Sequence, residues 1–92
     1  MYYVYVLKSA LNGDLYIGRC QNLRVRFKQH NLGKASATKA YRPWVLIYYE
    51  GYRDKKDTTV REKQLKNHAA KNSLLKQLGY SLKISKGHLV HR

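Results

Sequence analysis

The segment from Tyr2 to Leu7 contains only tyrosine, valine and leucine. Aromatic and β-branched residues favour strands, and a run without polar alternation is typical of a strand covered on both faces. Asn12-Gly13 then marks a turn, and Leu15 to Gly18 is predicted to return as the second strand of a hairpin. A chain of 92 residues can bury one modest core, so we expect one domain built around the first strand.

The register of this hairpin depends on its turn, and the sequence leaves two alternatives open. A tight two-residue turn at Asn12-Gly13 would place Tyr5 opposite Cys20. A longer loop would instead place Tyr5 opposite Tyr16. We favour the longer loop because it brings the two phenol groups together.

The middle of the chain predicts a helix followed by a strand. Asn22 is a good N-cap for a helix over Leu23–Leu32, and Gly33 would stop that helix. A third strand is expected over Trp44–Glu50, which is rich in aromatic and β-branched residues.

The last third of the chain predicts two more helices. One is expected to open at Thr59–Glu62 and run towards Ala70, and the other to be capped by Asn72 or Ser73. Alternating apolar positions then suggest a short strand at Tyr80, Leu82 and Ile84. This order predicts an α/β fold of the α+β type, with a three-stranded, mostly antiparallel sheet flanked by helices. We expect residues 1–79 to form the folded domain and residues 80–92 a basic C-terminal extension.

The charge of the chain points to a polyanionic partner. Nineteen Lys and Arg residues against five Asp and Glu give a net charge of +14. A nucleic acid would relieve the repulsion among these charges, and its binding should weaken steeply with salt. We expect DNA as the partner, with RNA as an alternative. Seven basic residues are the candidates for contact with phosphate groups: Arg19, Arg24, Lys28, Lys34, Lys39, Arg42 and Lys66.

The cysteine content and the hydropathy of the chain favour a cytoplasmic location. Cys20 is the single cysteine, so neither an intrachain disulfide nor a cysteine-based zinc site can form. The apolar opening segment lacks a basic leader and is too short for a signal peptide, and no run approaches the length of a membrane span.

Tyr5 and Tyr16 are the first candidates for chemistry. A functional role requires both phenols on one surface, close to a cation that lowers a phenol pKa towards the working range. The structural alternative is packing in a half-buried strand with the hydroxyl groups hydrogen-bonded. A further use of aromatic residues is stacking on bases, for which Tyr41, Trp44 and Tyr52 are candidates.

Arg26 and His30 lie one helical turn apart and flank the apolar stripe of Leu23 and Phe27, so both should lean towards the sheet. Arg26 could stabilise the charge that develops on a phosphate, or be one more solvated arginine. His30 could carry or orient a proton, or simply occupy the C-terminal end of the helix.

Glu62 is the candidate metal ligand. Mg²⁺ accepts one or two carboxylates and keeps several waters, so a single glutamate can hold it. Glu62 shares a helical face with Leu65 and Ala69, which favours an inward orientation. The alternative is a capping box, since Glu62 follows Thr59 at the spacing of that motif.

These residues, in this order, resemble the GIY-YIG nuclease family, in particular its small single-domain bacterial branch. Tyr3-Val4-Tyr5 stands where the family has Gly-Ile-Tyr or a variant, and Tyr16-Ile17-Gly18 matches the second half of the motif. Arg26 and His30 follow at the family's spacing, and segments 42–44 and 61–66 are also similar to the small branch.

The resemblance implies a GIY-YIG-like α/β sandwich over residues 1–79 and one divalent metal, Mg²⁺ or Mn²⁺, on Glu62. It further implies that one tyrosine prepares a water molecule to attack phosphorus while Arg26 steadies the developing charge. Tyr3 in place of glycine, together with Arg19 and Val25, departs from the family pattern.

The function predicted from these observations is a metal-dependent DNA endonuclease, structure-selective and related to repair, with Tyr5, Tyr16, Arg26, His30 and Glu62 at its site. The alternative is a non-catalytic nucleic-acid-binding module on the same scaffold. A third interpretation is an adaptor that docks through its basic tail. The oligomeric state is left open.

Overall fold

β1 lies at the centre of a single antiparallel sheet with the strand order β2-β1-β3. The computed structural model describes residues 1–83. Its elements are β1 (Tyr2–Ser9), β2 (Leu15–Cys20), α1 (Leu23–Asn31), a 3₁₀ turn (Lys39–Tyr41), β3 (Trp44–Tyr52), α2 (Lys55–Leu65) and α3 (His68–Gln77). The predicted α+β fold is confirmed, as is the order of its three sheet strands and three helices.

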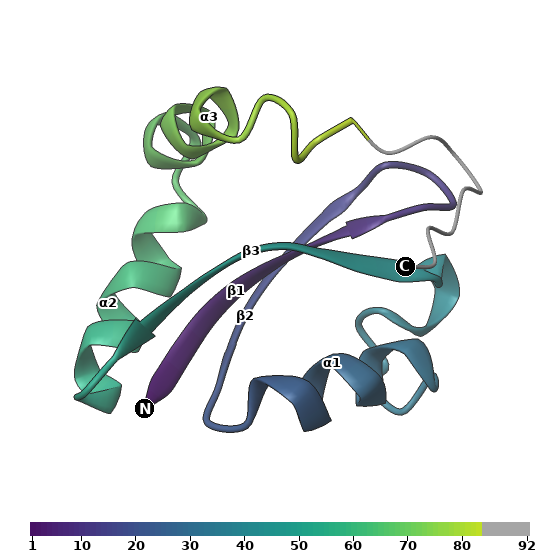
Figure 1. Cartoon of the computed structure of the whole chain (residues 1–92), viewed down its shortest axis with the longest axis horizontal. Helices are drawn as coiled ribbons and strands as arrows, with labels where there is room; N and C mark the ends of the chain where they lie inside the picture. The colour runs from purple at the N-terminus through teal and green to yellow at the C-terminus, as the bar shows by residue number, and fades with distance from the viewer. Residues whose placement is uncertain (84–92) are drawn as a thin grey trace.

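Helices cover both faces of the sheet (Figure 1): α1 lies on one face, and α2 and α3 lie on the other. Successive residues of β1 point to opposite faces, so Val4 and Val6 pack towards Leu65 and Leu74 of the α2/α3 layer. Tyr5 belongs to the second cluster, which packs against α1. The central position of β1 explains why its sequence carries no polar alternation.

The hairpin register differs from both predicted alternatives. Tyr5 pairs with Gly18, and Leu7 pairs with Tyr16. The turn is intermediate in length because Ser9 closes it: the Ser9 hydroxyl oxygen accepts hydrogen bonds from the N–H groups of Leu11 and Asn12. The observed register is two residues away from each alternative, which preserves the side-chain alternation. The two phenols therefore still lie on one face of the sheet.

The first helix is as predicted. The Asn22 side chain accepts a hydrogen bond from the N–H group of Val25 at 3.1 Å, and the helix ends at Asn31. Gly33 follows with φ +78°, in the left-handed region where glycine is least strained.

The starts of the two later helices were predicted wrongly. α2 begins at Lys55, where the Asp54 side chain caps it by accepting from the N–H group of Lys56 at 2.8 Å. Thr59 therefore lies inside α2, and the capping-box interpretation of Glu62 is wrong. α2 ends at Leu65, and Asn67 caps α3 rather than Asn72 or Ser73. Both true caps precede the predicted ones because an aspartate and an asparagine were available earlier in the chain.

Residues 78–82 form turns, so the strand suggested at Tyr80 and Leu82 is wrong for these two residues. Ile84 and the rest of the basic extension lie outside the described residues. None of the helices within residues 1–83 combines the length and the hydrophobicity that crossing a membrane requires.

Candidate active site

Three of the predicted site residues meet between the sheet and α1. The Tyr5 hydroxyl lies 2.7 Å from the Nε2 atom of His30, and both side chains are fully buried. The Tyr16 ring packs against both, with centroid distances of 6.3 Å to Tyr5 and 5.1 Å to His30. The predicted juxtaposition of the two phenols is therefore present, and the His30 imidazole reaches both of them from α1.

The hydrogen bonds around His30 favour one of its two tautomers. The Thr38 hydroxyl donates to the Ala35 carbonyl at 3.4 Å, so its oxygen is an acceptor towards His30 Nδ1 at 2.7 Å. We assign the proton to Nδ1 on this basis, which leaves Nε2 to accept from the Tyr5 hydroxyl. Burial, and secondarily the charge of Arg26, lowers the pKa of His30 below its ordinary value, so the neutral imidazole is the favoured form.

Arg26 approaches the same group from α1, but burial outweighs its effect on the pKa of Tyr5. Burial raises the pKa of Tyr5 to about 12, and this outweighs the opposite effect of the nearby Arg26 guanidinium. The cation acts in the expected direction, but the net pKa of Tyr5 is raised rather than lowered towards the working range. The Arg26 side chain is half-buried and also donates to the Gln29 side chain at 3.1 Å. Its guanidinium is thereby kept beside the phenols rather than free in solvent.

Glu62 lies on α2, which covers the opposite face of the sheet. Its carboxylate accepts from Arg19 Nε at 3.1 Å and lies 3.7 Å from Lys66 Nζ. The side chain is 20% exposed, which agrees with the predicted inward orientation. Glu62 is therefore held against β2 by an ion pair with Arg19, whereas Tyr5 and His30 lie against the other face of the sheet.

The free edge of β2 links the two faces. A hollow of about 290 Å³ there is lined by Leu15, Tyr16, Ile17, Lys66 and Lys71. Tyr16 reaches this hollow from the phenol cluster, and Lys66 reaches it from the neighbourhood of Glu62. A phosphate group in the hollow would therefore lie close to groups from both faces of the sheet.

Glu62 supplies one carboxylate on which a hard divalent cation could be bound, and its neighbours Arg19 and Lys66 are both cations. Within residues 1–83, no three His, Cys, Asp or Glu side chains lie together as a metal cage. Mg²⁺ does not need one, because it keeps several waters and takes further oxygens from a phosphate. The Oε2 atom of Glu62 is 3.7 Å from the Lys66 nitrogen, beyond hydrogen-bonding distance, so it retains lone pairs for a metal.

Glu50, the other partly buried acid of residues 1–83, is fully engaged with other side chains. It accepts from Arg61 at 2.9 Å and from the hydroxyls of Tyr48 and Tyr52. Burial raises the pKa of Glu50, but these hydrogen bonds together outweigh burial and hold the pKa below its ordinary value. The sequence carried no signal for this cluster, because Arg61 lies eleven residues further along the chain, on another element.

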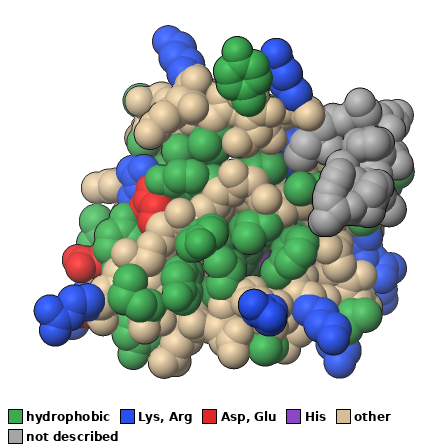
Figure 2. Space-filling view, in the orientation of Figure 1, with side chains coloured by type: hydrophobic (Ala, Val, Ile, Leu, Met, Phe, Trp, Pro, Cys, Tyr) green, Lys and Arg blue, Asp and Glu red, His purple; other side chains and the backbone are tan. Residues whose placement is uncertain are grey.

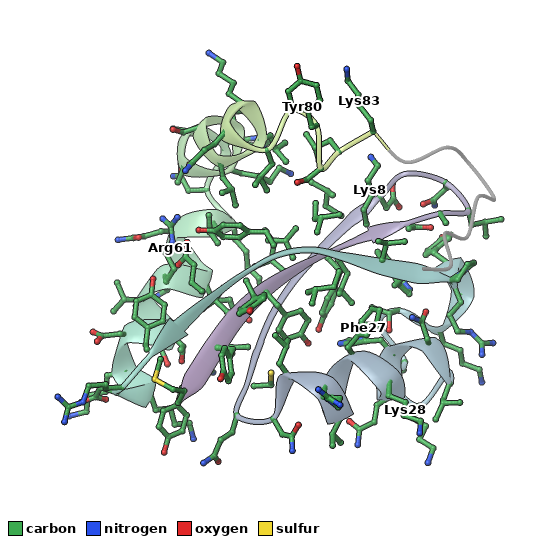
Figure 3. All side chains as sticks on the ribbon, in the orientation of Figure 1. Lys8, Phe27, Lys28, Arg61, Tyr80 and Lys83 are labelled. Atoms are coloured by element: carbon green, nitrogen blue, oxygen red, sulfur yellow. The ribbon has the colours of Figure 1, made fainter. Side chains whose placement is uncertain are left out.

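The basic candidates for phosphate contact fall on different parts of the surface. Lys34, Lys39 and Arg42 are exposed in the connection between α1 and β3. Arg24 and Lys28 are exposed on α1, and Figure 3 shows the Lys28 side chain directed away from the sheet. Arg19 and Lys66 flank Glu62.

The aromatic candidates for base stacking behave differently from one another. Tyr41 is exposed, as stacking requires. Trp44 is only 4% exposed and donates from its indole N–H to the Thr38 carbonyl at 2.8 Å, so its predicted role in stacking is wrong. Tyr52 is half-buried and donates its hydroxyl hydrogen bond to Glu50.

Comparison with known proteins agrees with this geometry. Residues 1–75 match the family described as the GIY-YIG catalytic domain. A UPF0213 protein of Staphylococcus haemolyticus (strain JCSC1435) is 38% identical over 74 residues, which is 79% of this chain and 89% of the relative. A UPF0213 protein of Staphylococcus aureus (strain Mu50) is 34% identical over the same shares of the two chains. No solved structure matches significantly. Since the family match covers most of the chain and every candidate site residue, the chain belongs to the GIY-YIG nuclease family.

Proposed function

We propose that this chain is a metal-dependent endonuclease that hydrolyses DNA phosphodiester bonds. The observation that carries this proposal is the buried Tyr5–His30 hydrogen bond beneath Tyr16, with Arg26 beside it and Glu62 across the edge strand. Phosphodiester hydrolysis requires groups that move protons and groups that stabilise negative charge. The strand is surrounded by a neutral imidazole, two phenols, a guanidinium and a carboxylate, which can supply both.

Tyr5 and Tyr16 differ in solvent exposure, and we therefore assign them different roles. Tyr5 is 1% exposed and donates to His30, so we assign it the task of orienting its neighbours rather than meeting water. Tyr16 is half-buried and lines the hollow at the β2 edge, where a water molecule and a phosphate can enter. After its own hydroxyl proton has passed to solvent, Tyr16 would accept the proton of the attacking water as the new oxygen–phosphorus bond forms. The leaving oxygen would take a proton from solvent as its bond to phosphorus breaks.

The second requirement of hydrolysis is to stabilise the negative charge on the phosphate. Arg26 would stabilise the negative charge that grows on the phosphate oxygens in the transition state. Glu62 would hold Mg²⁺ or Mn²⁺, which when bound supplies Lewis-acid polarisation of a phosphate oxygen. Arg19, now paired with Glu62, would then be free to contact phosphate.

Selectivity is expected to come from DNA shape. The exposed lysines and arginines proposed for phosphate contact carry no information about base sequence. Preference would then follow how readily a DNA bends or opens, as branched and flapped substrates do. A role in DNA repair and a cytoplasmic location belong to the same proposal.

The test is a cleavage panel of flapped, branched and plain duplex DNA with Mg²⁺, with Mn²⁺ and with EDTA. We expect metal-dependent cleavage by the wild type, and loss of cleavage in Glu62→Gln. Asp57→Asn removes a matched, exposed acid from the same helix and should leave cleavage unchanged. If the wild type cleaves none of these DNAs with either metal, or if Glu62→Gln cleaves normally, the proposal is wrong.

The Arg19–Glu62 ion pair favours one alternative, which is binding without cleavage. If Arg19 occupied the carboxylate permanently, the scaffold would retain its charge but could not take up metal. DNA binding would then survive in both Glu62→Gln and Arg26→Gln, and wild-type protein would leave DNA intact at every metal concentration.

A further inference from the structure

A second groove, away from the hollow at the β2 edge, is not explained by the phosphodiester chemistry. It measures about 720 Å³ and lies between the sheet and the N-terminal half of α1. Aromatic and aliphatic side chains form its wall, among them Tyr3, Tyr49, Phe27 and Leu46. Figure 2 shows hydrophobic side chains gathered on this front face between β3 and α1, and Figure 3 shows Phe27 turned from α1 towards the sheet.

Two tyrosines give this groove an exposed aromatic surface. The Tyr49 side chain is 55% exposed, and its ring meets the Tyr3 ring edge to face at a centroid distance of 5.9 Å. Gly51 pairs with Tyr3 across the sheet, and a Cβ atom there would lie 3.3 Å from the Tyr3 ring. The glycine thus leaves room for the Tyr3 ring over β3. Burying an exposed aromatic ring against a flat ligand would be favourable.

The groove adjoins the candidate active site. Tyr49 is directly opposite Tyr5 in the β1–β3 pairing, and Tyr3 is the next residue of β1 on the same face. On α1, Phe27 of the groove follows Arg26 of the site. A DNA strand with a phosphate at Arg26 could therefore continue along the groove.

The charge and polarity of the residues that line the groove indicate which class of ligand it can bind. Arg24 and the exposed amide Gln21 line the groove together with the aromatic residues, and none of its nine lining residues is acidic. A second copy of this chain would bring another +14 charge to the same surface, which opposes self-association. A base offers a flat π-face for Tyr49 and polar edges for Gln21, and its phosphate offers a negative charge for Arg24.

We propose that this groove binds an unpaired DNA base next to the cleaved phosphate, with stacking on Tyr49 as the main contact. The proposal deepens the proposed nuclease function and rests on it for the position of the phosphate. It assigns the substrate class as DNA with unpaired nucleotides beside the cleavage position. Fully paired duplex cannot place a base on Tyr49 without opening a pair.

Binding is measured on the full chain in EDTA, so the outcome does not depend on cleavage. The probe is a single-stranded oligonucleotide with one 2-aminopurine, compared with the same strand in a duplex. We expect wild-type protein to bind the single strand more tightly and to change the 2-aminopurine emission. Tyr49→Ala should weaken this binding about tenfold, in the range of one stacked base, and should abolish the emission change.

Three variants test the assignment. Tyr49→Phe keeps the ring and should bind like the wild type. Tyr80→Ala removes a tyrosine that is 88% exposed and does not line the groove, and it should also bind normally. Tyr3→Ala is the second groove variant, and it should weaken single-strand binding in the same direction as Tyr49→Ala.

Two outcomes would overturn the base site. One is equal affinity of wild type and Tyr49→Ala for the single strand. The other is self-association that Tyr49→Ala abolishes without any change in emission, which would assign the groove to a second copy of the chain. Wild-type protein that stacks the base but cleaves no DNA would overturn the proposed hydrolysis and leave the base site in the groove standing.

Discussion

The backbone of Gly18 lies so close to the Tyr5 side chain that a Cβ atom at position 18 would be 2.5 Å from the Tyr5 hydroxyl oxygen. These two residues are paired across β1 and β2. The same Cβ atom would also lie 3.0 Å from the Tyr16 ring. The glycine that ends the Tyr16-Ile17-Gly18 motif therefore has a physical role, which is to leave space for both phenols over β2.

Gly18→Ala should displace the Tyr5 hydroxyl from His30 and destabilise the protein by about 1–3 kcal/mol, the usual effect of adding a methyl group to a packed site. We expect cleavage to fall more than stability alone accounts for. Thermal unfolding and single-turnover cleavage measure the two effects. Gly79→Ala is the matched control, because a Cβ atom there would meet the Lys76 carbonyl oxygen at an ordinary van der Waals distance of 3.8 Å. A Gly18→Ala protein with wild-type activity would contradict this role.

The lowered pKa of His30 predicts that the protein loses stability as the solution becomes mildly acidic. Below its ordinary value of 6.5, His30 takes up a proton in the unfolded chain before it does so in the folded protein. The free energy of unfolding should therefore fall as the pH drops from about 7 to about 5.

The measurement is the melting temperature across this pH range for wild type and for His30→Gln. The variant should be less stable at pH 7 and should show a flatter pH dependence, because the titrating group is gone. His68→Gln, which replaces an exposed histidine on α3, should retain the wild-type slope. Identical slopes in wild type and His30→Gln would contradict the assignment.

Arg19→Gln should increase metal affinity if Glu62 is the metal ligand. Arg19 competes for the carboxylate and repels a cation, and an exposed ion pair of this kind contributes about 0.2–1 kcal/mol. We therefore expect the dissociation constant for Mn²⁺ to fall by up to about fivefold, measured by electron paramagnetic resonance without DNA. Arg53→Gln removes an exposed arginine elsewhere and should have no effect. Weaker Mn²⁺ binding in Arg19→Gln would show that the arginine does not compete.

Glu50→Gln should destabilise the contact between β3 and α2. Arg61 would lose its charged partner, and we expect a loss of about 1–3 kcal/mol because both side chains are partly exposed. The lowered pKa of Glu50 means that its contribution is present above its ordinary value of 4.5 and is lost as the pH falls through the folded-state value. Acid unfolding below pH 5 should therefore be less steep in Glu50→Gln. Asp57→Asn should behave like the wild type, and an equal loss in both variants would contradict the prediction.

The connection between α1 and β3 is predicted to bind phosphate through Lys34, Lys39 and Arg42. Replacing all three by glutamine should make the salt dependence of DNA binding shallower, by about 0.9 in log–log slope for each phosphate that is no longer neutralised. Fluorescence anisotropy over a range of salt concentrations measures this slope. Lys63→Gln and Lys76→Gln, on exposed positions of α2 and α3, should change it less for each charge removed.

Short-range features of the sequence were sufficient to predict most of the fold. The central strand follows from the uninterrupted apolar run at Tyr2–Leu7, and the start of α1 follows from Asn22, whose side chain bonds three residues ahead. The same reasoning misplaced the starts of α2 and α3, because several Asp, Asn, Ser and Thr residues could each cap a helix there. Asp54 and Asn67 are the caps that packing of α2 and α3 on the sheet selected.

The sequence by itself determined that Tyr5 and Tyr16 share a face of the sheet. The hairpin registers that it allowed differ by an even number of residues, and such a shift leaves every side chain on the same face. Only the tertiary structure decided what surrounds them: the hydrogen bond from Tyr5 to His30, 25 residues away, and the ion pair of Arg19 with Glu62, 43 residues away. Local patterns record which backbone conformation a segment prefers. The partners of a buried side chain depend on how helices and strands pack, and no local pattern specifies that packing.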